Sequence, residues 1–196
     1  GLNVGIGSEG SFGGGPIAGL LNWNQEIICL YQIEPELVIY AAAEGPTPLK
    51  ILTADSLDEL TRKLSDFDRQ RWIVRCPDGI LKGLTDREVI ALHQMSYTEW
   101  PVCLEPDFRA MYSPLRQIMI KKAALNLSER LQSKCPQCDA VNFWPDDREF
   151  GPPCTLCGEP TNEVKAFVSR CRSCGHCESE IKNEIGDPSY CNSCNP

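Results

Sequence analysis

The sequence predicts an α/β or α+β domain with a mixed sheet, followed by two small zinc ribbons. Runs rich in β-branched and aromatic residues alternate with segments that open on helix-capping signals. Paired cysteines gather in the last third, and 196 residues suit one core with an appendage. We therefore expect a partial α/β domain over residues 1–132, one zinc ribbon over 133–162 and a second over 163–196.

The first element is a strand over residues 2–7, expected to run into a glycine-rich loop over residues 8–16. Because Gly1 is not an initiator methionine and a strand begins at once, we expect a domain that is incomplete at its N-terminus, as a fragment or a cleaved product. A sheet that starts at its middle exposes an unpaired edge, so residues 1–7 are expected to pair with a second polypeptide, a dimer mate or a preceding segment. The glycines suit phosphate-binding amides and a plain wide turn equally.

Strands and helices then alternate as far as residue 105. Residues 26–33 and 36–43 predict a hairpin, because both are rich in Ile, Val, Leu and Tyr. Ser56 with Glu59, and Thr85 with Glu88, have the spacing of capping boxes that open amphipathic helices. Strands are also expected over 71–75, closed by a turn over 76–79, and over 101–105.

A last helix is expected from Pro114 to about Gln132. Ser113 supplies a capping hydroxyl, and proline suits the first helical position. The apolar side chains expected to face the core are Leu115, Ile118, Met119, Leu125 and Leu131.

Four Cys-x-x-Cys pairs dominate the tail, and we number them in chain order: Cys135 with Cys138, Cys154 with Cys157, Cys171 with Cys174, and Cys191 with Cys194. Fifteen residues separate the first two pairs and sixteen the last two, the arrangement in which two knuckles hold one tetrahedral zinc. We expect consecutive pairing, since it closes the shorter loops; interleaved pairing, first with third and second with fourth, stays open. Four thiolates leave no position for water, so two structural zinc ions are predicted.

Zinc suits this tail better than disulfides or iron–sulfur clusters. The cysteines come in close pairs behind a cysteine-poor domain, and iron–sulfur proteins space their cysteines differently. Metal also replaces the missing core, because structural zinc contributes roughly 10–16 kcal/mol of apparent binding energy. Without a signal peptide or a membrane-length apolar run, the sequence predicts a reducing cytoplasm and no membrane partner.

The charge argues against nucleic acid as a partner. The chain carries a formal net charge of −8. Residues 133–196 hold ten acidic and six basic residues, and two zinc tetrathiolates would bring this tail alone to −8. Such a surface repels a phosphate backbone.

The remaining cysteines and the two histidines carry weaker signals. Cys177 and His176 are expected to be a spare thiol and a surface imidazole, although either could replace a metal ligand. His93 lies on an expected helix, so histidine-based catalysis is poorly supported. Three further cysteines are expected to be buried apolar residues: Cys29, Cys76 and Cys103.

Carboxylates and arginines are the better candidates for chemistry. Glu105, Asp107 and Arg109 follow a strand end, where ligand sites of α/β sheets often lie. Arg116 stands in the first turn of the next helix, where a cation opposes the helix dipole, so it indicates an anionic partner; a salt bridge with Asp107 is the alternative. In the loop, Glu9 lies beside two hydroxyls.

Several runs together resemble a bacterial family of unknown function, domain of unknown function 6671, over essentially the whole chain. These runs are residues 5–13, 23–26, 105–110, 113–116, 135–138, 143–144, 153–161 and 187–196. The resemblance implies an inosine-triphosphatase-like domain, related by analogy to nucleotide pyrophosphatases, with zinc ribbons behind it. The resemblance also implies that the N-terminal part of the family is absent here.

On that resemblance, Glu9 and Asp107 would be magnesium ligands or general bases. Contacts to a magnesium-chelated nucleoside phosphate would come from Ser8, Ser11, Gly13, Lys82, Arg109 and Arg116. The chain departs from the family pattern after the loop, with Gly14 and Gly15 before Pro16, and has Met111, Ser113 and Leu115 where His, Asn and Thr are expected.

Two functions follow from the sequence. The first is binding of a magnesium-chelated nucleoside phosphate, with residual or partner-dependent pyrophosphatase activity. The second is a non-enzymatic scaffold that docks a larger complex through its zinc ribbons.

Overall fold

The computed structural model describes residues 1–15, 22–95 and 100–196, which fold as two compact units, Gly1–Asn126 and Leu127–Pro196. Of the two expected classes, α/β and α+β, the structure has the α+β class, with three sheets and three α-helices in the described ranges. Every pairing between named strands in these sheets is antiparallel.

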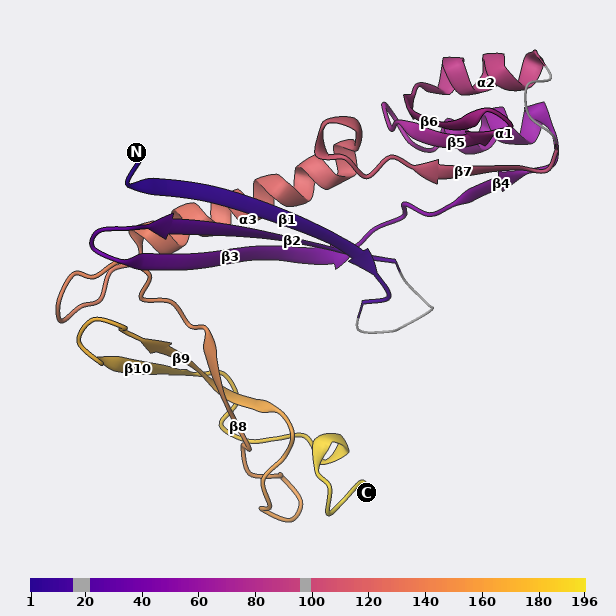
Figure 1. The fold of residues 1–196 in the computed structure, drawn as a ribbon. Coiled ribbons are helices and arrows are strands. Elements are labelled where there is room, and N and C mark those ends of the chain that lie inside the picture. The colour runs from indigo at the N-terminus through magenta and orange to yellow at the C-terminus, as the bar shows by residue number, and fades with distance from the viewer. Residues whose placement is uncertain (16–21, 96–99) are drawn as a thin grey trace. The chain divides into compact units, whose positions relative to one another are not determined.

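The first sheet has the order β1-β2-β3, built from β1 (Val4–Gly13), β2 (Trp23–Gln32) and β3 (Leu37–Pro46) (Figure 1). The hairpin predicted between β2 and β3 is confirmed, with Leu30 opposite Ile39 and Ile28 opposite Ala41. Alternate residues of β2 are buried, as expected for a sheet with one covered face. β1 lies at the edge of this sheet, so its pairing with another segment stays a prediction.

The predicted loop over residues 8–16 is wrong for residues 8–13. These residues continue β1, and each pairs with β2 as far as Gly13 opposite Trp23. Glycines are tolerated in the strand because antiparallel pairing with β2 satisfies their backbone groups. Gly14 and Gly15 follow the strand, and Pro16 lies outside the described residues.

Helix α3 (Pro114–Gln132) follows a short 3₁₀ turn, Ala110–Tyr112, and runs along the first sheet (Figure 1). Its bounds match the sequence prediction. The prediction that Ser113 caps the helix is wrong, because its Oγ is buried and makes no hydrogen bond in the described part of the chain. Ile118 and Leu125 are exposed rather than core-facing. The buried residues of the helix are Ala123 and Leu127, which lie four residues apart on one face. Ile118 and Leu125 lie five residues before and two residues after Ala123, so they fall on another face.

The second sheet has the order β4-β7-β5-β6 and carries the main hydrophobic core of the first unit. Its strands are β4 (Leu52–Ala54), β5 (Trp72–Cys76), β6 (Gly79–Leu84) and β7 (Val102–Pro106). Helices α1 (Leu57–Leu64) and α2 (Asp86–Gln94) pack on it through Leu60, Leu64 and Val89. None of the helices in the described ranges is both long and apolar enough to cross a membrane.

None of the three cysteines predicted to be buried is fully buried, and strand alternation explains the one that is exposed. Cys103 is exposed, because it lies between the buried residues Val102 and Leu104 on β7 and so points to the opposite face. Cys29 and Cys76 are half-buried.

The second unit contains a small sheet of order β10-β9-β8, formed by β8 (Asp147–Phe150), β9 (Val164–Arg170) and β10 (Cys177–Ile181). A 3₁₀ turn, Pro188–Tyr190, follows. Few large apolar residues are buried here, so sheet hydrogen bonds and the cysteine clusters described below must define this unit.

The capping box of α2 is present: the Thr85 hydroxyl accepts from the Glu88 amide at 3.1 Å, and the Glu88 carboxylate accepts from the Thr85 amide at 2.8 Å. Thr85→Ala is expected to lower the free energy of unfolding by about 1 kcal/mol, because one helix amide loses its acceptor. Thr61→Ala is the matched control, since the Thr61 hydroxyl only returns to the Leu57 carbonyl within α1. Urea unfolding followed by circular dichroism measures both; equal effects would contradict the capping role.

Candidate functional site

The eight paired cysteines form two four-cysteine clusters. The first cluster unites the first and third pairs, and the second cluster unites the second and fourth pairs. Within each cluster the candidate ligand atoms all lie within 4.8 Å of one another. Each of the expected ribbons, 133–162 and 163–196, therefore contributes one pair to each cluster.

The predicted consecutive pairing is wrong, and the interleaved alternative is correct. Thirty-two residues separate the first pair from the third, against fifteen between the first and second. Doubling a loop costs only about 0.6 kcal/mol of closure entropy, so loop length was a weak criterion. Backbone pairing decides instead: β9 and β10 place the third pair in the turn between them, and Cys154 forms a bridge with Gly186 close to the fourth pair.

The sulfur positions fit a tetrahedral metal ion. Across the first cluster, the Sγ atoms of Cys138 and Cys171 lie 3.5 Å apart, and across the second those of Cys154 and Cys194 lie 3.9 Å apart. Zinc bound to four thiolates at about 2.3 Å has sulfur–sulfur edges of about 3.8 Å, whereas a disulfide bond measures about 2.05 Å. Both clusters are therefore suited to a structural metal such as zinc, with no position left for a reacting water.

The pKa values of these thiols show why the clusters need the positive charge that a metal ion would supply. A hydrogen bond from the Cys174 amide is the main influence that lowers the pKa of Cys171 to about 6. The Ala140 amide also favours the thiolate of Cys138, but hydrogen bonds with neighbouring thiols outweigh it and raise the pKa of Cys138 to about 12. Four adjacent thiols thus resist ionising together, and a divalent cation would relieve that repulsion.

His176 and Cys177 lie outside both clusters, as expected. His176 stacks on Phe143 with ring centroids 5.6 Å apart and contacts the Glu178 carboxylate at 3.0 Å. Cys177 begins β10 and is exposed.

A cleft of about 830 Å³ lies in the first unit and collects most of the candidate polar residues. It is formed by the end of β1, the segment after β3, strands β5 to β7 and the start of α3. The lining residues are Gly10, Phe12, Gly13, Asn22, Thr47, Leu49, Lys50, Ile51, Ile73, Lys82, Glu105, Pro106, Asp107, Phe108, Arg109 and Arg116. Five of the eight predicted residues are among them: Gly13, Lys82, Asp107, Arg109 and Arg116.

Asp107 lines this cleft and is held by Arg109. Its side chain is 1% exposed, and Arg109 reaches it through Nε at 2.9 Å and Nη2 at 2.6 Å. Burial opposes ionisation of Asp107, but the hydrogen bonds from Arg109 prevail and its pKa lies below the usual value. Asp107 is therefore an ionised anchor that keeps the half-exposed guanidinium of Arg109 in place.

Arg116 has an anionic partner inside the chain, and it is Glu26 rather than Asp107. Arg116 Nε donates to Glu26 at 2.7 Å, and Nη1 donates to the Phe108 carbonyl at 2.6 Å. Glu26 is 1% exposed and also accepts from Asn24 at 3.1 Å. A buried carboxylate is tolerated here because a cation and a neutral donor satisfy it. In the sequence, the only signal of this ion pair was Glu26, an acidic residue at a buried position of a strand in which buried and exposed residues alternate.

Lys50 and Lys82 differ from these arginines. Both line the cleft and are exposed, and neither forms an ion pair within the described residues. Lys82 was predicted, but Lys50 was missed because it lies in an irregular segment between β3 and β4 without any motif. Phe12 and Phe108 line the same cleft and stack with ring centroids 4.0 Å apart.

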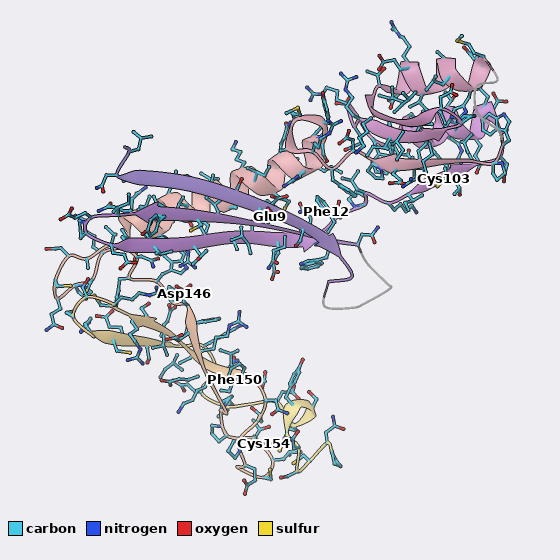
Figure 2. All side chains as sticks on the ribbon, in the orientation of Figure 1. Glu9, Phe12, Cys103, Asp146, Phe150 and Cys154 are labelled. Atoms are coloured by element: carbon cyan, nitrogen blue, oxygen red, sulfur yellow. The ribbon has the colours of Figure 1, made fainter. Side chains whose placement is uncertain are left out.

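Ser8, Glu9 and Ser11 are not brought into the cleft. Glu9 lies opposite Ile27, one residue from the Gly10–Glu26 pair, so its side chain points to the other face of the sheet. Figure 2 shows Glu9 and Phe12 along the same strand. Ser8 is exposed on β1, and Ser11 lines a separate hollow with Trp23, Gln25 and Glu44. The structure therefore does not unite Glu9 with Asp107.

Comparison with known proteins gives one match. The family described as Domain of unknown function (DUF6671) matches residues 1–196, so the chain belongs to this family. No curated protein and no solved structure matches it. The expected likeness to inosine-triphosphatase-like enzymes is not confirmed by these comparisons.

Metal counting separates the two pairing schemes. Replacing the first and third pairs by alanine is expected to leave one bound zinc, because the second cluster stays complete. Replacing the first and second pairs is expected to remove both, since each cluster then keeps only two thiols. Native mass spectrometry of zinc-loaded protein gives the stoichiometry. The reverse result, two lost in the first variant and one kept in the second, would restore consecutive pairing.

Gly10 is required by the ion pair beneath it. A Cβ at this position would meet the Arg116 guanidinium and would lie 2.5 Å from a Glu26 carboxylate oxygen. Gly10→Ala is expected to reduce the free energy of unfolding by about 1–3 kcal/mol through overpacking. Gly7→Ala is the control, because nothing lies within 4 Å of its added Cβ on the same strand. Thermal unfolding of both variants is the measurement, and a loss shared by Gly7→Ala would refute the steric explanation.

Proposed function

We propose that the cleft of the first unit binds an anionic ligand of the nucleoside phosphate class. The observation that carries the proposal is the pair of unneutralised cations, Lys50 and Lys82, on one cleft of a chain whose net charge is −8. Cations concentrated in a concave site attract anionic ligands even when the whole protein repels them.

The other charges of the cleft support an anion rather than a cation as the ligand. Asp107 is neutralised by Arg109, and Glu105 is paired with Arg75 at 2.9 Å. The two lysines are left to be matched by a ligand. Phosphate oxygens are suitable partners, because an ammonium group donates up to three charge-assisted hydrogen bonds.

The apolar part of the cleft supports a ligand with an aromatic group. Phe12 and Phe108 present a stacked pair at the lining, and Leu49 and Ile51 add aliphatic surface. Asn22 and Thr47 contribute amide and hydroxyl groups to the same lining. A base with attached phosphates matches this combination of aromatic, polar and cationic surface better than inorganic phosphate alone.

Binding is better supported than hydrolysis. A magnesium-dependent pyrophosphatase step needs free carboxylates beside the phosphates. Asp107 is occupied by Arg109, and Glu9 is on the other face of its sheet. Glu105 is the lining carboxylate with partial exposure, at 35%, so it is the candidate magnesium ligand should turnover occur.

A nucleotide panel tests this function. Nucleoside mono-, di- and triphosphates and inorganic pyrophosphate are titrated calorimetrically with and without magnesium, and phosphate release is followed in parallel. Lys50→Gln and Lys82→Gln are each expected to weaken binding about 10- to 100-fold, the loss of one charge-assisted contact worth about 1.5–3 kcal/mol.

Lys122→Gln is the matched control, because Lys122 is an exposed lysine of α3 outside the cleft lining. Its affinity is expected to equal that of the unaltered chain. The proposal is wrong if no member of the panel binds, or if Lys122→Gln weakens binding as much as the cleft variants do.

A further inference from the structure

One lobe of the second unit folds around the second cluster, and we define it as residues 151–164 and 183–196. Backbone hydrogen bonds close it: the Thr155 amide donates to Gly186 at 3.1 Å, and the Gly186 amide donates to Pro153 at 2.8 Å. The Asn162 amide donates to Tyr190 at 2.9 Å. The lobe is therefore a fixed scaffold for the side chains that it carries.

Three large apolar side chains of this lobe face solvent. Leu156 is 75% exposed between the ligands of the second pair, Ile185 is 64% exposed beside Gly186, and Tyr190 is 55% exposed beside the fourth pair. All three stand within two residues of a cysteine ligand or of the Cys154–Gly186 bridge, so all three belong to the backbone that holds the second cluster. Scattered exposed apolar residues are ordinary, but three on so small a lobe suggest an interaction surface.

The charge of the same lobe has one sign. It contains four acidic residues and no lysine or arginine: Glu159, Glu163, Glu184 and Asp187. Glu159, Glu184 and Asp187 are exposed. Lys165 and Lys182 adjoin the lobe where it joins β9 and β10, and the Lys165 carbonyl accepts from the Asn183 amide at 3.1 Å, so the basic residues nearest in sequence lie at its base. Apolar side chains ringed by carboxylates complement a segment that is both basic and apolar.

We propose that this lobe docks a basic protein segment, rich in lysine or arginine, that inserts a large apolar side chain among Leu156, Ile185 and Tyr190. Nucleic acid and anionic membranes would be repelled by the carboxylates, and a second copy of the lobe carries the same charge. The proposal does not depend on the ligand of the cleft in the first unit.

Selection from a displayed library of random dodecapeptides, on the zinc-loaded chain, tests the proposal. Enriched peptides are expected to contain several lysines or arginines with at least one large apolar residue. The strongest binder is then labelled with fluorescein and titrated by anisotropy at low and high salt. Leu156→Ser, Ile185→Ser and Glu184→Lys are each expected to weaken it at least about tenfold, and high salt to weaken it further.

Ile181→Ser is the matched control, since Ile181 is 60% exposed on β10, outside the lobe, and its removal is expected to leave affinity unchanged. Retention of both zinc ions in every variant confirms that the fold is intact. The proposal is overturned if no basic–apolar peptide is enriched, or if Leu156→Ser binds like the unaltered chain. It is equally overturned if single-stranded DNA or anionic vesicles bind the lobe more tightly, or if sedimentation shows a dimer that Leu156→Ser abolishes.

Discussion

The interleaving of the four cysteine pairs is the constraint on which the second unit depends. Each cluster joins residues more than thirty positions apart, so neither half of the tail can form a complete site alone. Burial of apolar side chains cannot hold the tail together in place of these clusters, because the large buried apolar side chains of residues 133–196 are essentially limited to Phe143 and Val168. The short β8–β9–β10 sheet holds the strands together, and a metal ion bound in each cluster would hold the distant cysteine pairs together.

Two carboxylate–arginine pairs have a comparable role in the first unit. The Glu26–Arg116 pair joins β2 to the start of α3, and the Asp107–Arg109 pair orders the segment after β7. Burying a charge is costly, and each carboxylate is nearly inaccessible, but each receives at least two hydrogen bonds from its arginine. Both arginines are therefore already paired within the protein, whereas Lys50 and Lys82 remain available to bind a ligand.

The two units thus offer surfaces of opposite character. The cleft presents unpaired cations and a stacked aromatic pair, whereas the lobe around the second cluster presents carboxylates and exposed aliphatic side chains. Closed tetrathiolate sites contribute no reacting water, so the metal would act on the structure and charge of the tail. The family match describes the whole chain without assigning an activity, and the functional argument rests on these surfaces.

The sequence by itself determined a domain that combines helices and strands, the β2–β3 hairpin, the Thr85 capping box, the bounds of α3 and the eight clustered thiols, since all depend on spacing and local chemistry. Only the tertiary structure decided which pairs share a cluster, because loop entropy separates the alternatives weakly. It also decided that residues 8–13 are strand, that Glu9 faces away from Asp107, and that Glu26 is the partner of Arg116. These features depend on strand register and on contacts between residues ninety positions apart in the sequence, which no local pattern encodes.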